Sequence, residues 1–325
     1  MQFITRDRQF YKTLAALTTP MAMQNLVNFG VSMADTVMVG MIGEVHLAAL
    51  SLANQLSFVF ILLMFGLGSG SSVMVAQYWG KGDLRSIHKV ITLMYRFVFA
   101  AAVLFAGMAL FLPGHVMRVF TTDAATVEVG AQYLRYAGIS YIPLGIAGVT
   151  MMMLRAIRAV RISLIVSSVS LVVNVFLNWV LIFGNLGMPA MGVRGAAVTT
   201  VFSRSLELVI ILFYMARFER KLCYRLRYLF MPGMRFIREY AFTALPVVAN
   251  ELLWGAGSAM IAVIIGRMGT EFTAANAVCA TLGQLVTVVI FGVANAGTVV
   301  MGNTVGAGKY EHAREQARAM ICISL

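Results

Sequence analysis

Long apolar runs recur along this chain and constrain its fold more than any other feature. Eight stretches of about 20 to 30 residues carry few charged side chains, and a tilted helix of about that length crosses a hydrocarbon core about 30 Å thick. They cover residues 14–42, 47–78, 90–112, 131–154, 163–183, 195–216, 241–266 and 273–304, and a ninth begins near Ala317. The pattern predicts an all-α, polytopic membrane protein.

The composition excludes most other classes of protein. Hydrophobic residues make up 60% of the 325 residues, charged residues make up 12%, and the mean hydropathy is +0.84, so a soluble domain would expose large apolar surfaces. The net charge of +12 does not indicate a nucleic-acid partner, because the basic residues lie between apolar runs. The three cysteines lack metal-ligand spacing, and the sequence contains no HExxH or GxSxG motif that would indicate an enzyme.

The distribution of Lys and Arg predicts the orientation in the membrane. Of the 25 basic residues, 20 lie in the N-terminal segment and the connections on one side, four lie on the other side, and Arg204 lies within a predicted helix. Basic residues resist translocation across the bilayer. We therefore expect a multi-pass protein of the cell inner membrane with a cytoplasmic N-terminus.

The sequence also repeats itself. A shift of 226 residues places Pro20 on Pro246, Gly66 on Gly292 and Gly80 on Gly306 without a gap, and glycine and proline have specific backbone roles that make such matches informative. Six predicted helices separate equivalent points, so both copies cross the membrane in the same direction. The sequence predicts two parallel-repeat six-helix bundles related by an axis along the membrane normal.

This repeat also predicts how the chain is divided. We expect the first six-helix bundle and a cytoplasmic linker at residues 1–225, and the first part of a homologous second bundle at residues 226–325. Residue 325 corresponds to Phe99, in the middle of the third helix of the first copy. We therefore expect a C-terminally truncated form of a longer chain, in which the seventh and eighth helices are poorly enclosed and transport is lost.

Several segments carry a resemblance to a known family. They are TTPMAMQNLVNFGVSMADTVMVGMIG, LAALSLANQL, GSGSSVMVAQYWGKGD, LNWVLIFG, GVRGAAVTT and GNTVGAGKYEHA, spread over essentially the whole chain. Together they resemble the MATE (multidrug and toxic compound extrusion) transporters. The resemblance implies a V-shaped pair of bundles that exchanges inward Na⁺ or H⁺ for an outward amphipathic, often cationic, drug. It implies a monomer that contacts lipid and small-molecule drugs and needs no cofactor besides the coupling ion.

One alternative function stays open at this point. A flippase for lipid-linked saccharide precursors has a related architecture, but it should have a more basic central cavity to hold a pyrophosphate. Most basic residues of this chain lie in the predicted cytoplasmic connections, which favours the drug transporter.

A candidate cation site follows from depth in the membrane. Asp35 lies about eight residues before Gly43, Asn178 about seven before Asn185, and Thr200 about eight after Gly192, so each lies about 10 to 12 Å inside the membrane. Asn174 shares a helix face with Asn178. Carboxylate, amide and hydroxyl oxygens suit Na⁺, whereas burial of Asp35 would suit H⁺. The resemblance implies the same set, with the acid, the asparagine pair and the threonine on three helices.

Each candidate also has a structural interpretation. Asp35 could be an interfacial anchor, and Asn174 and Asn178 could form interhelical hydrogen bonds without binding an ion. Thr200 could bond its own backbone, and Thr199 is an equal neighbour.

A second group of polar residues is assigned to a substrate cavity. Gln24 and Asn28 continue the face of Asp35 along the first helix, and Asn250 and Glu251 follow Pro246 in the seventh helix. A cavity-facing Glu251 would attract cationic substrates or bind a second proton, although a structural hydrogen bond is an equal alternative. Arg204 and Glu207, at i and i+3, predict a local ion pair.

Overall fold

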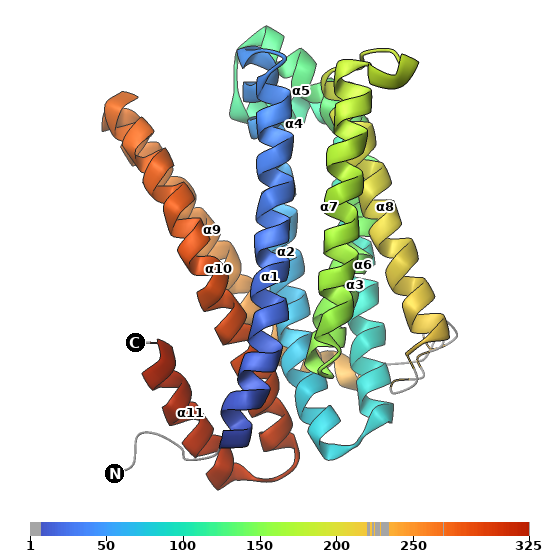
Figure 1. The fold of residues 1–325 in the computed structure, drawn as a ribbon, viewed down its shortest axis with the longest axis vertical. Coiled ribbons are helices and arrows are strands. Elements are labelled where there is room, and N and C mark those ends of the chain that lie inside the picture. Colours follow the sequence, from blue (N-terminus) through green and yellow to red (C-terminus); the bar gives the residue numbers. More distant parts are fainter. Residues whose placement is uncertain are drawn as a thin grey trace.

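The computed structural model describes residues 8–219, 222, 224, 228, 234–268 and 270–324, and within these ranges the regular structure is helical, with no strand (Figure 1). The α-helices are α1 (Arg8–Gly40), α2 (Glu44–Lys81), α3 (Leu84–Phe111), α4 (Pro113–Phe120), α5 (Ala124–Ala137), α6 (Tyr141–Ala156), α7 (Val160–Phe183), α8 (Val193–Arg217), α9 (Met234–Met268), α10 (Thr270–Gly306) and α11 (Tyr310–Ser324). Two 3₁₀ turns, η1 (Gly138–Ser140) and η2 (Asn185–Gly187), complete them.

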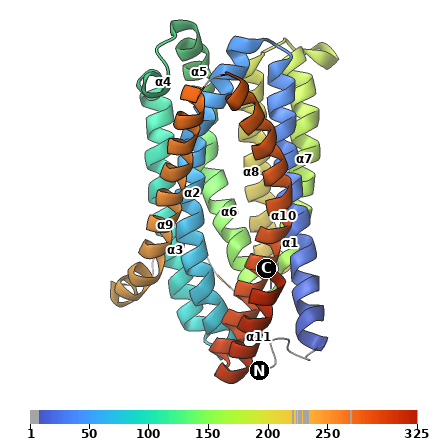
Figure 2. The same ribbon diagram turned by 90° about the vertical axis from the view of Figure 1, so that its left-hand side faces the viewer.

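Seven segments in the described part of the chain are long and apolar enough to cross a membrane. They are Glu44–Lys81, Leu84–Phe111, Ala124–Ala156, Val160–Phe183, Val193–Arg217, Phe236–Ile261 and Val286–Gly306. The 33-residue α1 runs alongside them (Figures 1 and 2). It is not one of the seven, because Gln24, Asn28 and Asp35 lower its mean hydropathy. The predicted all-α polytopic class is confirmed.

The connection between the third and fourth predicted spans is more structured than expected. Pro113 occupies the first turn of α4, where its missing N–H costs no helical hydrogen bond. Asp123 then caps α5 by accepting a hydrogen bond from the Thr126 backbone N–H at 2.9 Å. The helices α4 and α5 lie at the end of the molecule that is farther from both chain termini (Figure 1).

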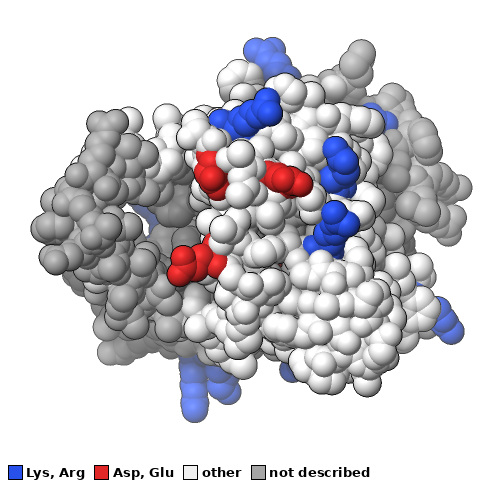
Figure 3. Space-filling model, turned by 90° about the horizontal axis from the view of Figure 1, so that it is seen from above, with Lys and Arg blue, Asp and Glu red and all other residues white. Residues whose placement is uncertain are grey.

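The two ends of the molecule differ in charge. The N-terminal start of α1, the α2–α3 turn, the α6–α7 connection, the end of α8 and the α10–α11 turn lie at the end near the termini (Figure 1), and they carry the basic groups that define the predicted cytoplasmic side. Lys221, Arg225 and Arg227 and the predicted boundary between residues 225 and 226 lie outside the described residues. Figure 3 shows the opposite end, where basic and acidic side chains are mixed among uncharged ones.

The internal repeat is visible in the packing between its two copies. The helix α9 packs along α2, and α10 packs along α1 and α2 (Figure 2). A Cβ placed on Gly66 would lie 2.6 Å from Val248 Cα, and one placed on Gly292 would lie 3.0 Å from Ala22 Cβ. Ala22 and Val248 are themselves 226 residues apart. The two contacts are therefore equivalent under the sequence repeat, as expected for copies related by a two-fold axis.

The crossing of α2 and α10 obeys the same relation. Gly80 packs against the backbone of Asn303, and Gly306 packs against the backbone of Gln77, which is the equivalent contact with the copies exchanged. A side chain at either glycine would meet the backbone of the other helix. These glycines allow the two copies to pack backbone against backbone at the end of the molecule near the termini.

Candidate functional site

The helices α1 and α7 bring together the carboxylate and the amides predicted for the cation site. Asn178 Nδ2 donates a hydrogen bond to Asp35 Oδ1 at 2.5 Å and a second one to Asn174 Oδ1 at 3.3 Å. The Asn174 side chain also lies close to the Asp35 carboxylate. Because α1 and α7 pack side by side, three residues that are distant in sequence form one hydrogen-bonded cluster.

The asparagines of this cluster are deeply buried, and Asn178 is incompletely bonded. Asn178 has 0% and Asn174 has 2% of its surface exposed, whereas Asp35 is half-buried. Asn178 Oδ1 is buried without a hydrogen-bond partner among the described residues. A buried acceptor without a partner costs about 1 to 3 kcal/mol. The site therefore holds a carboxylate and, on the asparagine bonded to it, an unsatisfied amide oxygen, and oxygens of these two kinds would suit a hard cation such as Na⁺ once the amide is turned.

An ion pair lies close to the cluster. Arg204 Nη1 contacts both carboxylate oxygens of Glu207 at 3.0 Å, as the i, i+3 spacing predicts. Arg204 also interacts electrostatically with Asp35. The Arg204 charge is thus shared between two carboxylates, one on its own helix and one on α1.

The structure places Thr200 differently from the other candidates. Its hydroxyl donates a hydrogen bond to the Ala196 carbonyl of its own helix at 2.9 Å. This bond to its own backbone is the structural alternative to ion binding that the sequence left open for Thr200. Thr200 also lies close to Tyr133, and Tyr133 lies close to Asp35. Tyr133 of α5 therefore lies near the cluster, and no sequence pattern distinguished it from the apolar residues around it.

The residues assigned to a substrate cavity do not form one group. Gln24 is buried in the first bundle, where Nε2 donates to Ser167 Oγ at 3.3 Å and to Met151 Sδ at 3.4 Å, so it does not lie between the two repeats. Asn28 and Asn250 are exposed, and Glu251 is half-buried. Gln24 and Asp35 share one face of α1, as the helical periodicity predicts, but they contact different residues of α7.

A row of small polar residues on α7 leads away from the cluster. Ser163, Ser167 and Ser170 are buried and continue the face of Asn174 and Asn178 toward the N-terminal end of α7. Their spacing of three and four residues is that of one helix face. This pattern was visible in the sequence, but the serines resembled ordinary helix-packing residues.

The helical fold, the internal repeat and a buried polar cluster among apolar helices define a polytopic membrane protein built from two related halves. The MatE family model matches residues 20–180 and 246–325, and its two matched segments begin at Pro20 and Pro246, which the internal repeat also aligns. The chain therefore belongs to the MatE family.

Relatives with known names support the same assignment. The chain is 29% identical over 305 residues to the probable multidrug resistance protein NorM of Agrobacterium fabrum, covering 93% of this chain and 65% of that protein. It is 27% identical over 306 residues to the probable multidrug resistance protein NorM of Thermotoga maritima, covering 93% of this chain and 64% of that protein. The chain thus spans slightly less than two thirds of the length of these relatives.

Solved structures share the fold. An outward-facing multidrug resistance MATE transporter of the MOP superfamily has a TM-score of 0.87 at 22% identity, over 98% of this chain and 71% of that chain. A mutant of the Vibrio cholerae MATE transporter VcmN has a TM-score of 0.88 at 18% identity, over 97% of this chain and 70% of that chain. These likenesses establish the arrangement of helices.

Proposed function

We propose that the protein is a secondary active multidrug efflux transporter that exchanges Na⁺ or H⁺ against amphipathic or cationic drugs by alternating access. The relatives are named as multidrug resistance proteins, and the contact between Asp35 and Asn178 is the observation that carries the ion-coupled part of the proposal. A carboxylate inside a membrane protein is costly unless a partner or an ion compensates it.

Ion binding would change the contact between α1 and α7. Asn178 now donates to Asp35, so a Na⁺ ion shared by the two residues would require the amide to turn its oxygen toward the ion. A proton on Asp35 would have a similar effect, because a protonated carboxyl donates a hydrogen bond and the amide oxygen could then accept it. In both cases the Asn178 amide would present its oxygen, in place of its NH₂ group, toward Asp35.

The helix α1 can transmit this change to the other repeat. It packs against α7 within the first copy and against α10 of the second copy. Pro20 lies inside α1, and a proline in a helix interior removes one backbone hydrogen bond and favours bending there. Binding or release of the ion at Asp35 would thus shift α1 relative to α10.

The predicted orientation completes the proposal. The basic end of the molecule faces the cytoplasm of the cell that carries the protein in its inner membrane, and the end near Asp35 faces outward. The flippase alternative requires several basic groups between the copies, whereas Arg155 is the one basic residue among those that line the described pocket between α1, α2, α6 and α10.

Transport by proteoliposomes tests the proposal. The full-length protein that contains this chain would be purified and reconstituted, because the chain alone is expected to lose transport, and movement of the fluorescent cation ethidium would be followed under an imposed Na⁺ or H⁺ gradient. One of the two gradients should drive ethidium transport in the unchanged protein and in Asp123→Asn, which changes an acid at the outer end. Asp35→Asn should lose the gradient-driven component, and equal transport with and without a gradient in the unchanged protein would refute ion coupling.

A further inference from the structure

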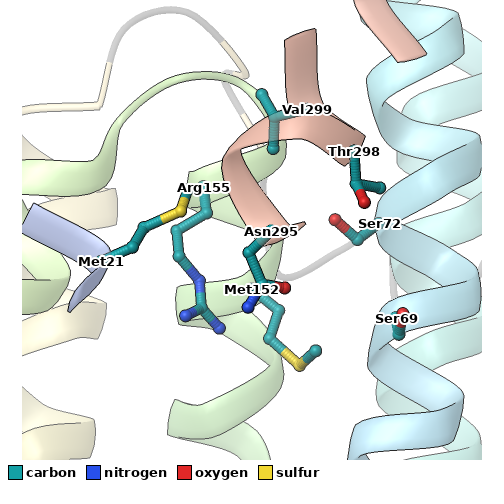
Figure 4. A pocket seen from close by; sticks show the side chains of 8 residues that line it. All are labelled: Met21, Ser69, Ser72, Met152, Arg155, Asn295, Thr298 and Val299. Carbon is teal, nitrogen blue, oxygen red and sulfur yellow. The ribbon is translucent and has the colours of Figure 1, made fainter. Parts of the chain in front are cut away.

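A small pocket lies between the two copies of the repeat, next to the crossing of α2 and α10. Its volume is about 20 Å³, enough for one or two water-sized occupants. It is lined by Met21 of α1, Ser69 and Ser72 of α2, Met152 and Arg155 of α6, and Asn295, Thr298 and Val299 of α10 (Figure 4). The pocket thus receives polar groups from both copies.

The repeat places this pocket close to the axis that relates the copies. A shift of 226 residues places Ser69 on Asn295 and Ser72 on Thr298, so both pairs of equivalent positions face the same space. Figure 4 shows the hydroxyl groups of Ser72 and Thr298 directed toward each other. A ligand bound here would contact both repeats at once.

Arg155 supplies a positive charge to the pocket. It lies in the last turn of α6, where a basic residue is favourable for the helix dipole, yet its guanidinium enters the pocket between Met21 and Asn295 (Figure 4). Among the described residues Arg155 has no ion-pair or hydrogen-bond partner, and none of the residues lining the pocket is acidic. A guanidinium has five donor hydrogens and no acceptor.

The other polar groups add donors. No hydrogen bond of the Ser69 or Ser72 hydroxyl is found within the described ranges, so both can donate to a ligand. Thr298 Oγ1 already donates to the Ala294 carbonyl at 3.0 Å, and Asn295 Nδ2 donates to the Phe291 carbonyl at 2.8 Å. The free donors of the pocket are therefore the Arg155 guanidinium, two serine hydroxyls of α2 and the second hydrogen of the Asn295 amide.

We propose that this pocket binds a small monovalent inorganic anion of about the size of chloride, held by Arg155, Ser69 and Ser72. Arg155 is half-buried, and a charge withdrawn from water gains from a counter-charge, while the volume admits a halide more readily than a larger organic anion. Because α10 closes the pocket, the anion stabilises the state in which α2 and α10 are packed together. Separation of the two copies at this end opens the pocket and releases the anion.

Thermal unfolding in detergent tests the site without measuring transport. Sodium chloride would be titrated against sodium gluconate at constant Na⁺ concentration and ionic strength. A ligand that binds the folded protein raises its Tm in a saturable way, so chloride should do so for the unchanged protein. Arg155→Gln should lose the shift, whereas Arg161→Gln, which removes an exposed basic residue at the same end, should keep it.

A second variant guards against misfolding of Arg155→Gln. Ser69→Ala combined with Ser72→Ala keeps the charge and removes two neutral donors, and it should raise the half-saturating chloride concentration about tenfold or more. Crystals grown with bromide in place of chloride should show anomalous scattering beside Arg155. Equal Tm values in chloride and gluconate, an unchanged chloride dependence in Arg155→Gln, or a shift produced by acetate but not by chloride would overturn the proposal.

Discussion

Ala76 of α2 packs directly against Gly302 of α10, and the two residues occupy equivalent positions in the two copies of the repeat. A Cβ placed on Gly302 would lie 2.8 Å from the Cβ of Ala76. A contact between equivalent positions must lie at the axis that relates the copies. This pair therefore marks the point where the two halves of the molecule meet.

Cysteines at these two positions should form a disulfide bond. The Cβ atoms in disulfides are typically about 3.8 Å apart, and small movements of α2 and α10 would provide this spacing. We expect rapid cross-linking of Ala76→Cys combined with Gly302→Cys, measured as loss of free thiol, and loss of ethidium transport that a reductant restores. Ala76→Cys alone is the control. Absence of cross-linking under all conditions would show that α2 and α10 do not meet here.

Replacing Asn178 should weaken the contact between α1 and α7. Asn178→Ala removes the donor to Asp35 Oδ1 and leaves the half-buried carboxylate with fewer partners, at an expected cost of about 1 to 3 kcal/mol. The measurement is the Tm in detergent. Asn185→Ala removes a half-buried asparagine of the η2 turn whose Nδ2 donates to the Trp179 carbonyl at 2.9 Å in an exposed hydrogen bond, and it should lower the Tm less. A larger loss in Asn185→Ala would contradict this interpretation.

The ion pair of α8 should show a measurable coupling energy. Glu207 is 5% and Arg204 is 28% exposed at the side chain, so removal of Glu207 leaves a partly buried guanidinium beside Asp35. Glu207→Gln should destabilise the protein by about 1.5 to 3 kcal/mol. Arg204→Gln combined with Glu207→Gln should be less destabilising than the sum of the single variants, and additive effects would show that the pair contributes nothing.

The turn between α2 and α3 should respond to pH. Gly82 has a φ of 78° and ends α2 in the left-handed conformation. Asp83 then caps α3: its Oδ1 accepts a hydrogen bond from the Ser86 backbone N–H at 3.1 Å, and its Oδ2 accepts one from Ser86 Oγ at 2.6 Å. The hydrogen bonds from the Ser86 side chain and backbone lower the pKa of Asp83. The cap is thus at full strength above the ordinary aspartate pKa of about 4, and it weakens as the pH falls through the lower pKa of the folded state.

Removal of this cap should matter at neutral pH and less in acid. Asp83→Ala should lose about 1 kcal/mol of stability near pH 7, as measured by thermal unfolding, and the difference from the unchanged protein should shrink below about pH 4. Arg85→Gln, an exposed neighbour, serves as the control. A constant difference between Asp83→Ala and the unchanged protein across this range would mean that the charge of Asp83 does not strengthen the cap.

The helical fold was predictable because lipid imposes a simple rule on the sequence. Each backbone group must be satisfied within its own segment, so apolar length alone marked the helices. The meeting of Asp35 with Asn178 was predictable from depth, since helices that cross the same slab place residues at comparable distances from its surface. Depth does not encode rotation about the helix axis, and for this reason the sequence left open whether Thr200 would bond its own helix, as it does, and did not predict that Gln24 would turn toward Ser167.

The polar pocket between the copies was harder to foresee. Arg155 was grouped with the basic residues of a cytoplasmic connection, because it stands one residue before the end of α6. Its direction depends on the approach of α10, which is set by the glycine contacts between helices that are distant in sequence. Contacts of this kind leave no periodic signal in either helix alone.

The most direct test of the account is whether the drug displaces an ion from Asp35. Ethidium would be added to the purified protein in weakly buffered solution, and the release of Na⁺ and of H⁺ would be followed with a sodium electrode and a pH indicator. The account predicts release of one of these ions from the unchanged protein and none from Asp35→Asn, with Asp123→Asn behaving as the unchanged protein. Equal release from Asp35→Asn and from the unchanged protein would contradict it.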